Sequence, residues 1–338
     1  MPGSVTSTFS EPEDFEDALR KEGCRGLVIT GRGRFRARLT QITLHRLRLS
    51  AAEEQLPRIA FITVPNDIIV LAFSIDDETA PVGGQVQTRS HEIMVLSPGE
   101  QVHLRTNGPS CCAAIRFPAE ELAQYGSAMN GVPFVAPTAT LHWRPPREAI
   151  RRLRSLHAAA LRMAATRPQA LVDADAARGL EQQLIDATVD CLSAGSTDED
   201  TRRGHRNRDT MARFEQLLQQ RHSRILPMAE TCAALDVSEQ VLRGLCTEHL
   251  GMSPTAYDRL RRMSLARRAL RRGAPEAPSV SEVARHYGFR NLGRFAITYH
   301  AAYGEHPSAT LRRRSGSVTR KSRVDRAASA RPNVSDLN

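Results

Sequence analysis

Two segments in the last third of the chain repeat one pattern, and this repeat constrains the fold more than any other feature of the sequence. The first segment spans residues 228–246. In it, a short amphipathic helix is predicted to end near Leu235, Asp236 fits a left-handed turn, and Ser238 fits the cap of a second helix. In the second segment Asn291, 53 residues later, takes the position of Ser238. Each segment is therefore predicted to form a helix–turn–helix motif.

Local signals also define the second motif. Ser279 and Glu282 fit a capping box, and Gly288 fits the turn between the two helices. We expect the cores of the two motifs to contain Cys232, Leu242, Ala284, Gly288, Phe289, Phe295 and Pro307.

The charge of the chain is distributed unevenly. Its net charge is +10, yet residues 1–204 carry −2, residues 205–314 carry +9, and residues 315–338 carry +3. Such asymmetry indicates two modules. The basic module binds a polyanion, and the module joined to it is nearly neutral.

One helix is predicted to link the two motifs, from Pro254 to Arg272, with Ser253 as its cap. Its apolar stripe is Tyr257, Leu260, Met263, Ala266 and Leu270. The arginines predicted to lie outside the stripe are Arg261, Arg262, Arg267, Arg268, Arg271 and Arg272. A helix of this length is a rod of roughly 28 Å. Such a rod could hold two recognition helices in successive major grooves of DNA, about 34 Å apart.

The first part of the chain has the pattern of β-strands from about residue 25 to 118. The run at 39–49 alternates apolar and polar residues, and two apolar runs within 57–73 are separated by a turn-type cluster. Two further short strands are expected within 92–105, about a turn at Pro98 and Gly99. The spacing predicts a sandwich or small barrel rather than a βαβ sheet.

After Pro146 the apolar spacing becomes helical. We predict five regions: a β-rich sensing or dimerisation domain at 1–140, a helical connector at 141–193, a linker at 194–208, the domain with both motifs at 209–314, and a disordered basic tail at 315–338.

Several well-spaced positions resemble the DNA-binding domain of the AraC/XylS family of transcriptional regulators. The match is strongest for SEVARHYGF at 281–289, followed by Phe295 and Pro307, and it is also good for GMSPTAY at 251–257. Residues 9–140, best at RSHEIMVLSPG (89–99), resemble the amino-terminal β-domain of the family. The resemblance implies an α+β multidomain chain: a cupin-like β-barrel or sandwich with a helical appendage, then an all-α domain with two helix–turn–helix motifs.

Alignment with the family also assigns the residues expected to approach DNA. They are Ser238, Gln240, Arg243, Arg290, Asn291, Gly293, Arg294 and Ile297. Each polar side chain could contact a base edge or a phosphate. The chain departs from the family at Asp236 and Cys246, and it lacks the usual cation at Gly244 and Ile297. The first motif nevertheless keeps Gln240 and Arg243 on the exposed face of its recognition helix. We therefore hypothesise that the first motif reads bases and that the second mainly anchors the DNA backbone through Arg290 and Arg294.

Other functional classes find less support in the sequence. No apolar run reaches the length of a membrane span, and the acidic amino terminus lacks a signal core. His103 lacks the partners of a cupin metal motif, the pair Cys111–Cys112 is expected to pack, and Cys24, Cys191, Cys232 and Cys246 are expected in cores. No catalytic motif was found, so neither a metal nor a cofactor nor enzymatic activity is expected.

The favoured interpretation is a cytoplasmic, homodimeric transcription regulator, an activator that contacts double-stranded DNA and RNA polymerase and can respond to a small-molecule effector. Dimerisation is expected through residues 1–200, because the connector helices have apolar faces. The alternatives are a cupin-type metal-dependent enzyme fused to a DNA-binding module, a DNA-alkyl repair protein and a structural nucleoid protein.

Overall fold

The computed structural model describes residues 2–75, 82–83, 86–87, 91–130, 140–193, 195–197, 201–221, 225, 227–272 and 279–313. The chain divides into two compact units, each described by itself. The amino-terminal unit holds residues 1–220 and 226–258, and the carboxy-terminal unit holds residues 221–225 and 259–338. The tail predicted to be disordered, 315–338, lies outside the described residues.

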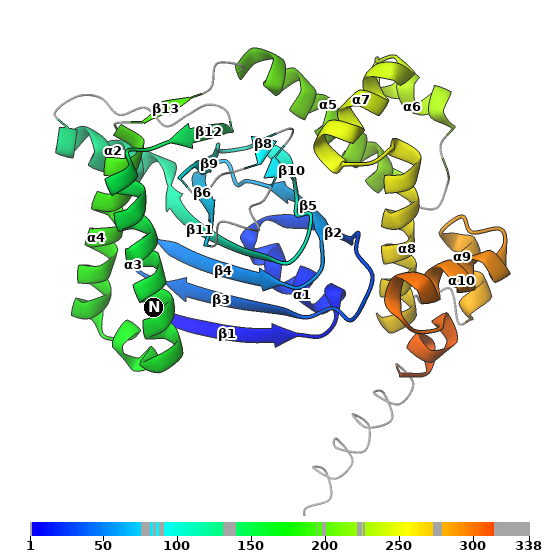
Figure 1. Ribbon diagram of the computed structural model, residues 1–338, viewed down its shortest axis with the longest axis horizontal. Helices are drawn as coiled ribbons and strands as arrows, with labels where there is room; N and C mark the ends of the chain where they lie inside the picture. The colour runs from blue at the N-terminus through cyan, green and yellow to red at the C-terminus, as the bar shows by residue number, and fades with distance from the viewer. Residues whose placement is uncertain are drawn as a thin grey trace, which may run out of the picture. The chain divides into compact units, whose positions relative to one another are not determined.

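The strands of the amino-terminal unit form two antiparallel sheets (Figure 1). The larger has the order β1-β3-β4-β11-β6-β9-β12-β13, and the smaller has the order β2-β5-β10-β7-β8. The strands are β1 Gly3–Phe9, β2 Cys24–Ile29, β3 Ala37–Thr43, β4 Arg48–Glu54, β5 Arg58–Thr63, β6 Ile68–Ser74, β7 Val82–Gly83, β8 Val86–Gln87, β9 Ile93–Leu96, β10 Gln101–Arg105, β11 Ser110–Pro118, β12 Leu141–Arg144 and β13 Ser196–Thr197. The predicted β-domain without βαβ units is confirmed.

Helices accompany these sheets in the same unit. They are α1 Pro12–Leu19, the 3-10 turn η1 Arg20–Glu22, α2 Ala119–Asn130, α3 Arg147–Thr166, the 3-10 turn η2 Pro168–Leu171, α4 Ala174–Ser193 and α5 Thr201–Gln220. Two of them, α3 and α4, are the helices expected after Pro146.

Strand β6 is buried on both faces. Ile69 and Leu71 pack in a cluster with residues of α3 and α4, whereas Val70 packs in another cluster with Val102 of β10. Successive side chains of a strand point to opposite faces. The larger sheet is therefore the middle layer, between the smaller sheet and the helices, and this double burial explains the continuous apolar run in β6.

The apolar faces of α3 and α4 are used inside the chain. Leu153 of α3 and Leu184 of α4 are fully buried in the cluster that includes strands of the larger sheet. The apolar faces on which the expected dimer was based therefore pack against the sheet of the same chain.

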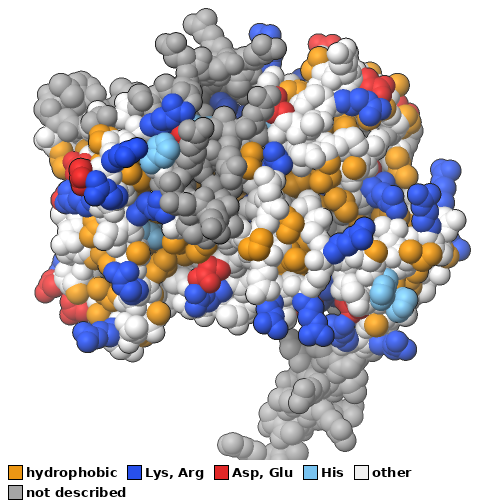
Figure 2. All heavy atoms as spheres, in the orientation of Figure 1, with side chains coloured by type: hydrophobic (Ala, Val, Ile, Leu, Met, Phe, Trp, Pro, Cys, Tyr) orange, Lys and Arg blue, Asp and Glu red, His pale blue; other side chains and the backbone are white. Residues whose placement is uncertain are grey.

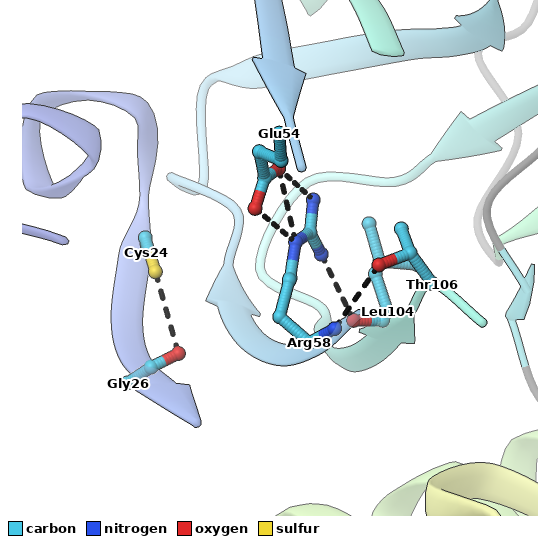
Figure 3. Close-up of polar contacts among 6 residues, drawn as sticks. All are labelled: Cys24, Gly26, Glu54, Arg58, Leu104 and Thr106. Atoms are coloured by element: carbon cyan, nitrogen blue, oxygen red, sulfur yellow. Dashed lines mark hydrogen bonds and ion pairs between the residues drawn. The ribbon is translucent and has the colours of Figure 1, made fainter. Parts of the chain in front are cut away.

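A buried ion pair joins the two sheets (Figure 3). Glu54 ends β4 of the larger sheet, and Arg58 begins β5 of the smaller one. Arg58 donates through Nε and Nη2 to Oε1 of Glu54 at 3.1 Å, and through Nη1 to the Leu104 carbonyl at 3.0 Å. The guanidinium group therefore holds β4, β5 and β10 together.

Two predicted boundaries differ from the structure, and one predicted turn is confirmed. The run 39–49 is not one strand, because residues 44–47 turn the chain and the Leu44 N–H donates to the Leu47 carbonyl. The two short strands expected about Pro98 and Gly99 are present as β9 and β10, and the turn between them passes from the larger sheet to the smaller. Within the connector range 141–193, β12 is a strand, and Nε1 of its Trp143 donates to the Cys191 carbonyl at 2.7 Å.

The predicted linker 194–208 is partly helical, since α5 begins at Thr201.

Helix α5 packs against β10 through a buried polar cluster. Tyr257 donates its hydroxyl to Oε2 of Glu215 at 2.7 Å, and Nε2 of His103 lies 3.4 Å from the same oxygen. His103 is thus an internal side chain of β10, as expected, but its helical partners were not predicted.

The cysteines follow the sequence interpretation with one exception. Cys24, Cys191 and Cys246 are buried, whereas Cys232 is only half-buried, as are Cys111 and Cys112. Burial raises the pKa of the Cys24 thiol to about 12.

Among the described residues, no group of three or more His, Cys, Asp or Glu side chains could hold a metal ion. In the same part of the chain, no helix is both long and apolar enough to cross a membrane.

Candidate nucleic-acid interface

The first helix–turn–helix motif has the predicted local geometry. It consists of α6 Met228–Leu235 and α7 Glu239–Leu250. Asp236 adopts the left-handed conformation with φ of 56°, which a short polar side chain tolerates. Ser238 caps α7 by accepting the Val241 N–H at 3.3 Å. These features confirm the predicted turn and cap.

The second motif consists of α9 Val280–His286 and α10 Leu292–Tyr303. Ser279 accepts the Glu282 N–H at 3.2 Å, and the Glu282 carboxylate accepts the Ser279 N–H at 3.0 Å, which completes the capping box. Gly288 has a φ of +77° at the turn, a value that favours glycine. Both predicted signals are confirmed.

Both motifs have small but well-buried cores. In the first, Leu242 and Cys246 are fully buried, and burial raises the pKa of the Cys246 thiol to about 12. In the second, Ala284 is fully buried, and the Phe289 and Phe295 rings lie 4.9 Å apart. Pro307 is buried, while Phe289 is half-buried. Cys232, predicted for the core, is half-buried, because Thr231 and Leu235 occupy the inner face of α6.

The recognition helix of the first motif exposes Gln240 and Arg243. Arg243 does not extend freely into solvent. Its Nη2 and Nε donate to Oε1 of Glu239 at 2.6 and 2.8 Å, one helical turn away. Both side chains are about half-exposed, so water weakens the pair and the guanidinium remains available to an anion.

The recognition helix of the second motif, α10, begins at a capped end. Oδ1 of Asn291 accepts the Arg294 N–H at 2.9 Å, as Ser238 does for α7. The carbonyl oxygen of this side chain is therefore occupied by its own helix. The remaining residues that we expected at the DNA lie at or near this end of α10, and all of them are exposed. They are Arg290, Gly293, Arg294 and Ile297.

The linking helix, α8 Pro254–Arg272, has the predicted bounds and the predicted cap, since Ser253 accepts the Ala256 N–H at 3.3 Å. The expectation that all six of its arginines lie outside the packed stripe is wrong. Arg262 and Arg267 are each only 5% exposed. Arg262 donates to the Tyr287 carbonyl at 3.0 Å and lies over the Phe289 ring, while Arg267 lies over the Tyr303 ring. The packed face of α8 is thus wider than its apolar residues.

A cavity of about 270 Å³ in the carboxy-terminal unit adjoins the start of α10. Four arginines line it, Arg259, Arg262, Arg290 and Arg294, and its lining includes no acidic side chain. On the face drawn in Figure 2, the charged side chains over α8 to α10 are mainly basic. This basic surface suits a phosphate backbone. The contribution of Arg259 and Arg262 was not predicted, because the spacing of α8 shows only its apolar stripe.

Comparisons with known proteins agree with this geometry. Residues 231–313 match the family model described as a helix-turn-helix domain. The XylDLEGF operon transcriptional activator of Pseudomonas putida is 34% identical over 100 residues, which cover 30% of this chain and 31% of that protein. The probable thc operon regulatory protein of Rhodococcus erythropolis is 34% identical over 87 residues, or 26% of each protein. The chain thus covers about a third or less of the length of these curated relatives.

Solved structures also resemble the chain. The crystal structure of the AraC-like transcriptional activator CuxR aligns with 78% of this chain and 94% of its own, at 14% identity and a TM-score of 0.42. A probable AraC family transcriptional regulator from Rhodopseudomonas palustris aligns with 31% of this chain and 97% of its own, at 28% identity and a TM-score of 0.29.

Proposed function

Because the chain belongs to the AraC/XylS family through its carboxy-terminal helix–turn–helix domain, we propose that it is a sequence-specific, DNA-binding regulator of transcription. The observation that carries the proposal is the pair of capped recognition helices, α7 and α10, whose outward faces hold arginine, glutamine and isoleucine side chains. A capped, exposed helix beside basic residues has the form of a reading element for the major groove.

We propose that polar base contacts come from the first motif, through Gln240 and Arg243, and backbone contacts from the second, through Arg290 and Arg294. Arginine can bind guanine with two hydrogen bonds, and glutamine can bind adenine in the same way. The arginine-lined cavity at the start of α10 supports the assignment of backbone contacts to the second motif.

The direction of regulation is proposed to be activation, with RNA polymerase as a partner, because curated relatives are named transcriptional activators. The place of action is then the cytoplasm. The curated relatives are named as an operon transcriptional activator and an operon regulatory protein, and this favours a regulator over the cupin-type metal-dependent enzyme fused to a DNA-binding module.

We also propose a homodimer formed through residues 1–200, on surfaces other than the faces of α3 and α4 that pack against the sheet. Sedimentation of the full chain at micromolar concentration tests it: a dimer is expected, and a monomer contradicts it.

A small polar effector is proposed at a cavity of about 660 Å³ near the ends of β1, β3 and β4. Its lining includes Arg36, Arg38 and Glu53.

The experiment for the main proposal selects binding sites for the full chain from a randomised duplex library. Enrichment of one motif, followed by tight binding to that duplex and weaker binding to a shuffled one, is the expected result. Placing the motif upstream of a reporter promoter should then raise transcription when the protein is present. Equal binding to all duplexes contradicts the proposal of sequence specificity.

A further inference from the structure

Ile297 is the most exposed large hydrophobic side chain in the described part of the chain, at 73%. Single exposed apolar residues are common on protein surfaces and need no explanation by themselves. The position of this one is what matters. It lies in the middle of α10, on the side opposite the buried residues Phe295 and Tyr299.

Two of the four neighbours of Ile297 on this face are small. An α-helix has 3.6 residues per turn, so Gly293 and Ala301 lie one turn before and one turn after Ile297. Both are exposed, and a Cβ atom added at Gly293 would meet only Oδ1 of Asn291, at 3.6 Å. The other two neighbours, Arg294 and His300, are larger and also exposed. Gly293 and Ala301 thus leave space beside Ile297, so that a surface bound by α10 can come close to the helix backbone there and meet the isoleucine side chain.

The charged residues nearby indicate which surface this is. Arg294 is exposed in the first turn of the same helix, and Arg290 is exposed just before the cap residue Asn291. A surface that binds these arginines through phosphates brings the middle of α10 to the base edges. The partner that fits both features is duplex DNA with its major groove facing α10.

The floor of the major groove offers mainly hydrogen-bond donors and acceptors, and its distinct apolar group is the C5-methyl of thymine. Isoleucine placed over any other base edge would remove water from polar groups without replacing their hydrogen bonds. We propose that Ile297 determines specificity by contacting the C5-methyl group of a thymine in the operator. This inference rests on the proposed function and adds one apolar base contact to the backbone contacts of the second motif.

The first motif lacks this reading element. Its position equivalent to Ile297 is Gly244, which is exposed and has no side chain. The thymine preference therefore belongs to the half of the operator that α10 contacts, and the other half lacks it at the corresponding position.

The test removes the methyl group alone. Each thymine of the duplex selected by the full chain is replaced in turn by deoxyuridine, which pairs identically but lacks the methyl. At one position in the half-site of α10, the wild-type protein should bind about fourfold more weakly, the effect of losing one buried methyl group. At the other positions the affinity should change much less.

Variants assign the effect to Ile297. Ile297→Ala should bind the thymine and deoxyuridine duplexes equally, and Ile297→Arg should shift the selected base at that position toward guanine. Val172→Ala, a substitution at an exposed apolar residue of the amino-terminal unit, is the matched control and should behave as the wild type. Because Ile297 is so exposed, thermal unfolding of its variants should match that of the wild type.

Three results would overturn the inference. The first is a selected motif in which no thymine responds to deoxyuridine. The second is a response that persists unchanged in Ile297→Ala. The third is unchanged DNA binding by Ile297→Ala together with lost activation of the reporter, which would assign the side chain to RNA polymerase. Failure to select any motif would instead overturn the proposed function, and the inference with it.

Discussion

Arg243 is paired with Glu239 before DNA arrives, and this pairing shapes what the residue can do. The two groups are joined by two short hydrogen bonds but are about half-exposed. Exposed pairs of this kind stabilise a helix only weakly. Glu239 therefore orients the guanidinium group without retaining it, and a guanine edge can replace the carboxylate at little cost in free energy.

Replacing Arg243 by Ala should blunt the discrimination between operator and random DNA by about 5- to 150-fold, the range for one lost bidentate base contact. Arg294→Ala should instead weaken binding to both duplexes alike and lower the salt dependence by about one phosphate contact. Competition binding at several salt concentrations measures both effects. Glu239→Gln, which frees Arg243 without removing it, is the control and should retain discrimination. If Arg294→Ala alters the preferred sequence while Arg243→Ala does not, the roles of the two motifs are reversed.

His157 of α3 is almost fully buried against Phe73, their rings 5.4 Å apart, and burial lowers the pKa of the imidazole to about 4. The unfolded chain, with a histidine pKa near 6.5, binds this proton more readily. Stability should therefore be lost as pH falls from 6.5 toward 4, by up to about 3 kcal/mol for this group.

Urea unfolding at pH 7, 6 and 5 checks this expectation, with His157→Leu as the comparison. The variant should lose less stability on acidification than the wild type. A residual dependence should remain, because burial, with His103 and Arg208 nearby, also lowers the pKa of His249 to about 4. Identical pH dependence in the two proteins would show that His157 does not contribute.

At the scale of elements, the sequence predicted the exact cap residue wherever a side chain near the start of a helix caps it. Ser238, Ser279 and Asn291 each accept a backbone N–H three residues ahead, an interaction that depends on local sequence alone. The start of α5 was not predictable in this way. Its buried apolar residues begin only at Met211, so the preceding polar turns have the pattern of a linker.

Burial of arginine is the other element-level feature that the sequence did not reveal. Apolar periodicity assigns every arginine to the surface, yet Arg262 and Arg267 of α8 are buried over aromatic rings. Their long apolar stems and planar head groups allow this packing once a carbonyl or carboxylate lies within reach. Such partners come from α9 and the segments around α10, distant in sequence, so spacing within α8 carries no signal for them.

The cap of α10 gives a prediction that separates structure from recognition. Asn291→Ala should destabilise the protein by about 1 kcal/mol, because the Arg294 N–H loses its acceptor. Asn291→Ser should retain most of that stability, since Ser238 performs the same task in the first motif. Thermal unfolding measures the stability, and binding to the selected operator measures recognition. Full binding by Asn291→Ser assigns the residue to capping; loss of specificity with stability intact assigns it to a base contact.

At the scale of the whole molecule, charge and fold divide the chain in different places. The basic excess begins near residue 205, whereas the amino-terminal unit continues through α5, α6 and α7 to Asp258. The first motif thus belongs to the unit that contains the β-sheets, and the second belongs to the other. Helix α8 contributes to both units, with residues 254–258 in the first and 259–272 in the second.

We expect α8 to impose a fixed spacing on the two half-sites of the operator. The helix is continuous over Pro254–Arg272 and contains neither glycine nor proline after its first residue. A rod of roughly 28 Å can relate recognition helices in successive major grooves on one face of the duplex, about 34 Å apart. A packed helix resists the bending that any other spacing would demand.

Insertions between the half-sites of the selected duplex test this spacing. Five added base pairs place the half-sites on opposite faces and should reduce the affinity to that of a single half-site. Ten added base pairs restore the face but double the distance, so a rigid α8 should fail there as well, whereas a flexible connection would recover binding. The same insertions outside the operator serve as controls and should have no effect. Recovery of the affinity with ten added base pairs would therefore show that the two motifs move independently, and that α8 does not set the spacing of the half-sites.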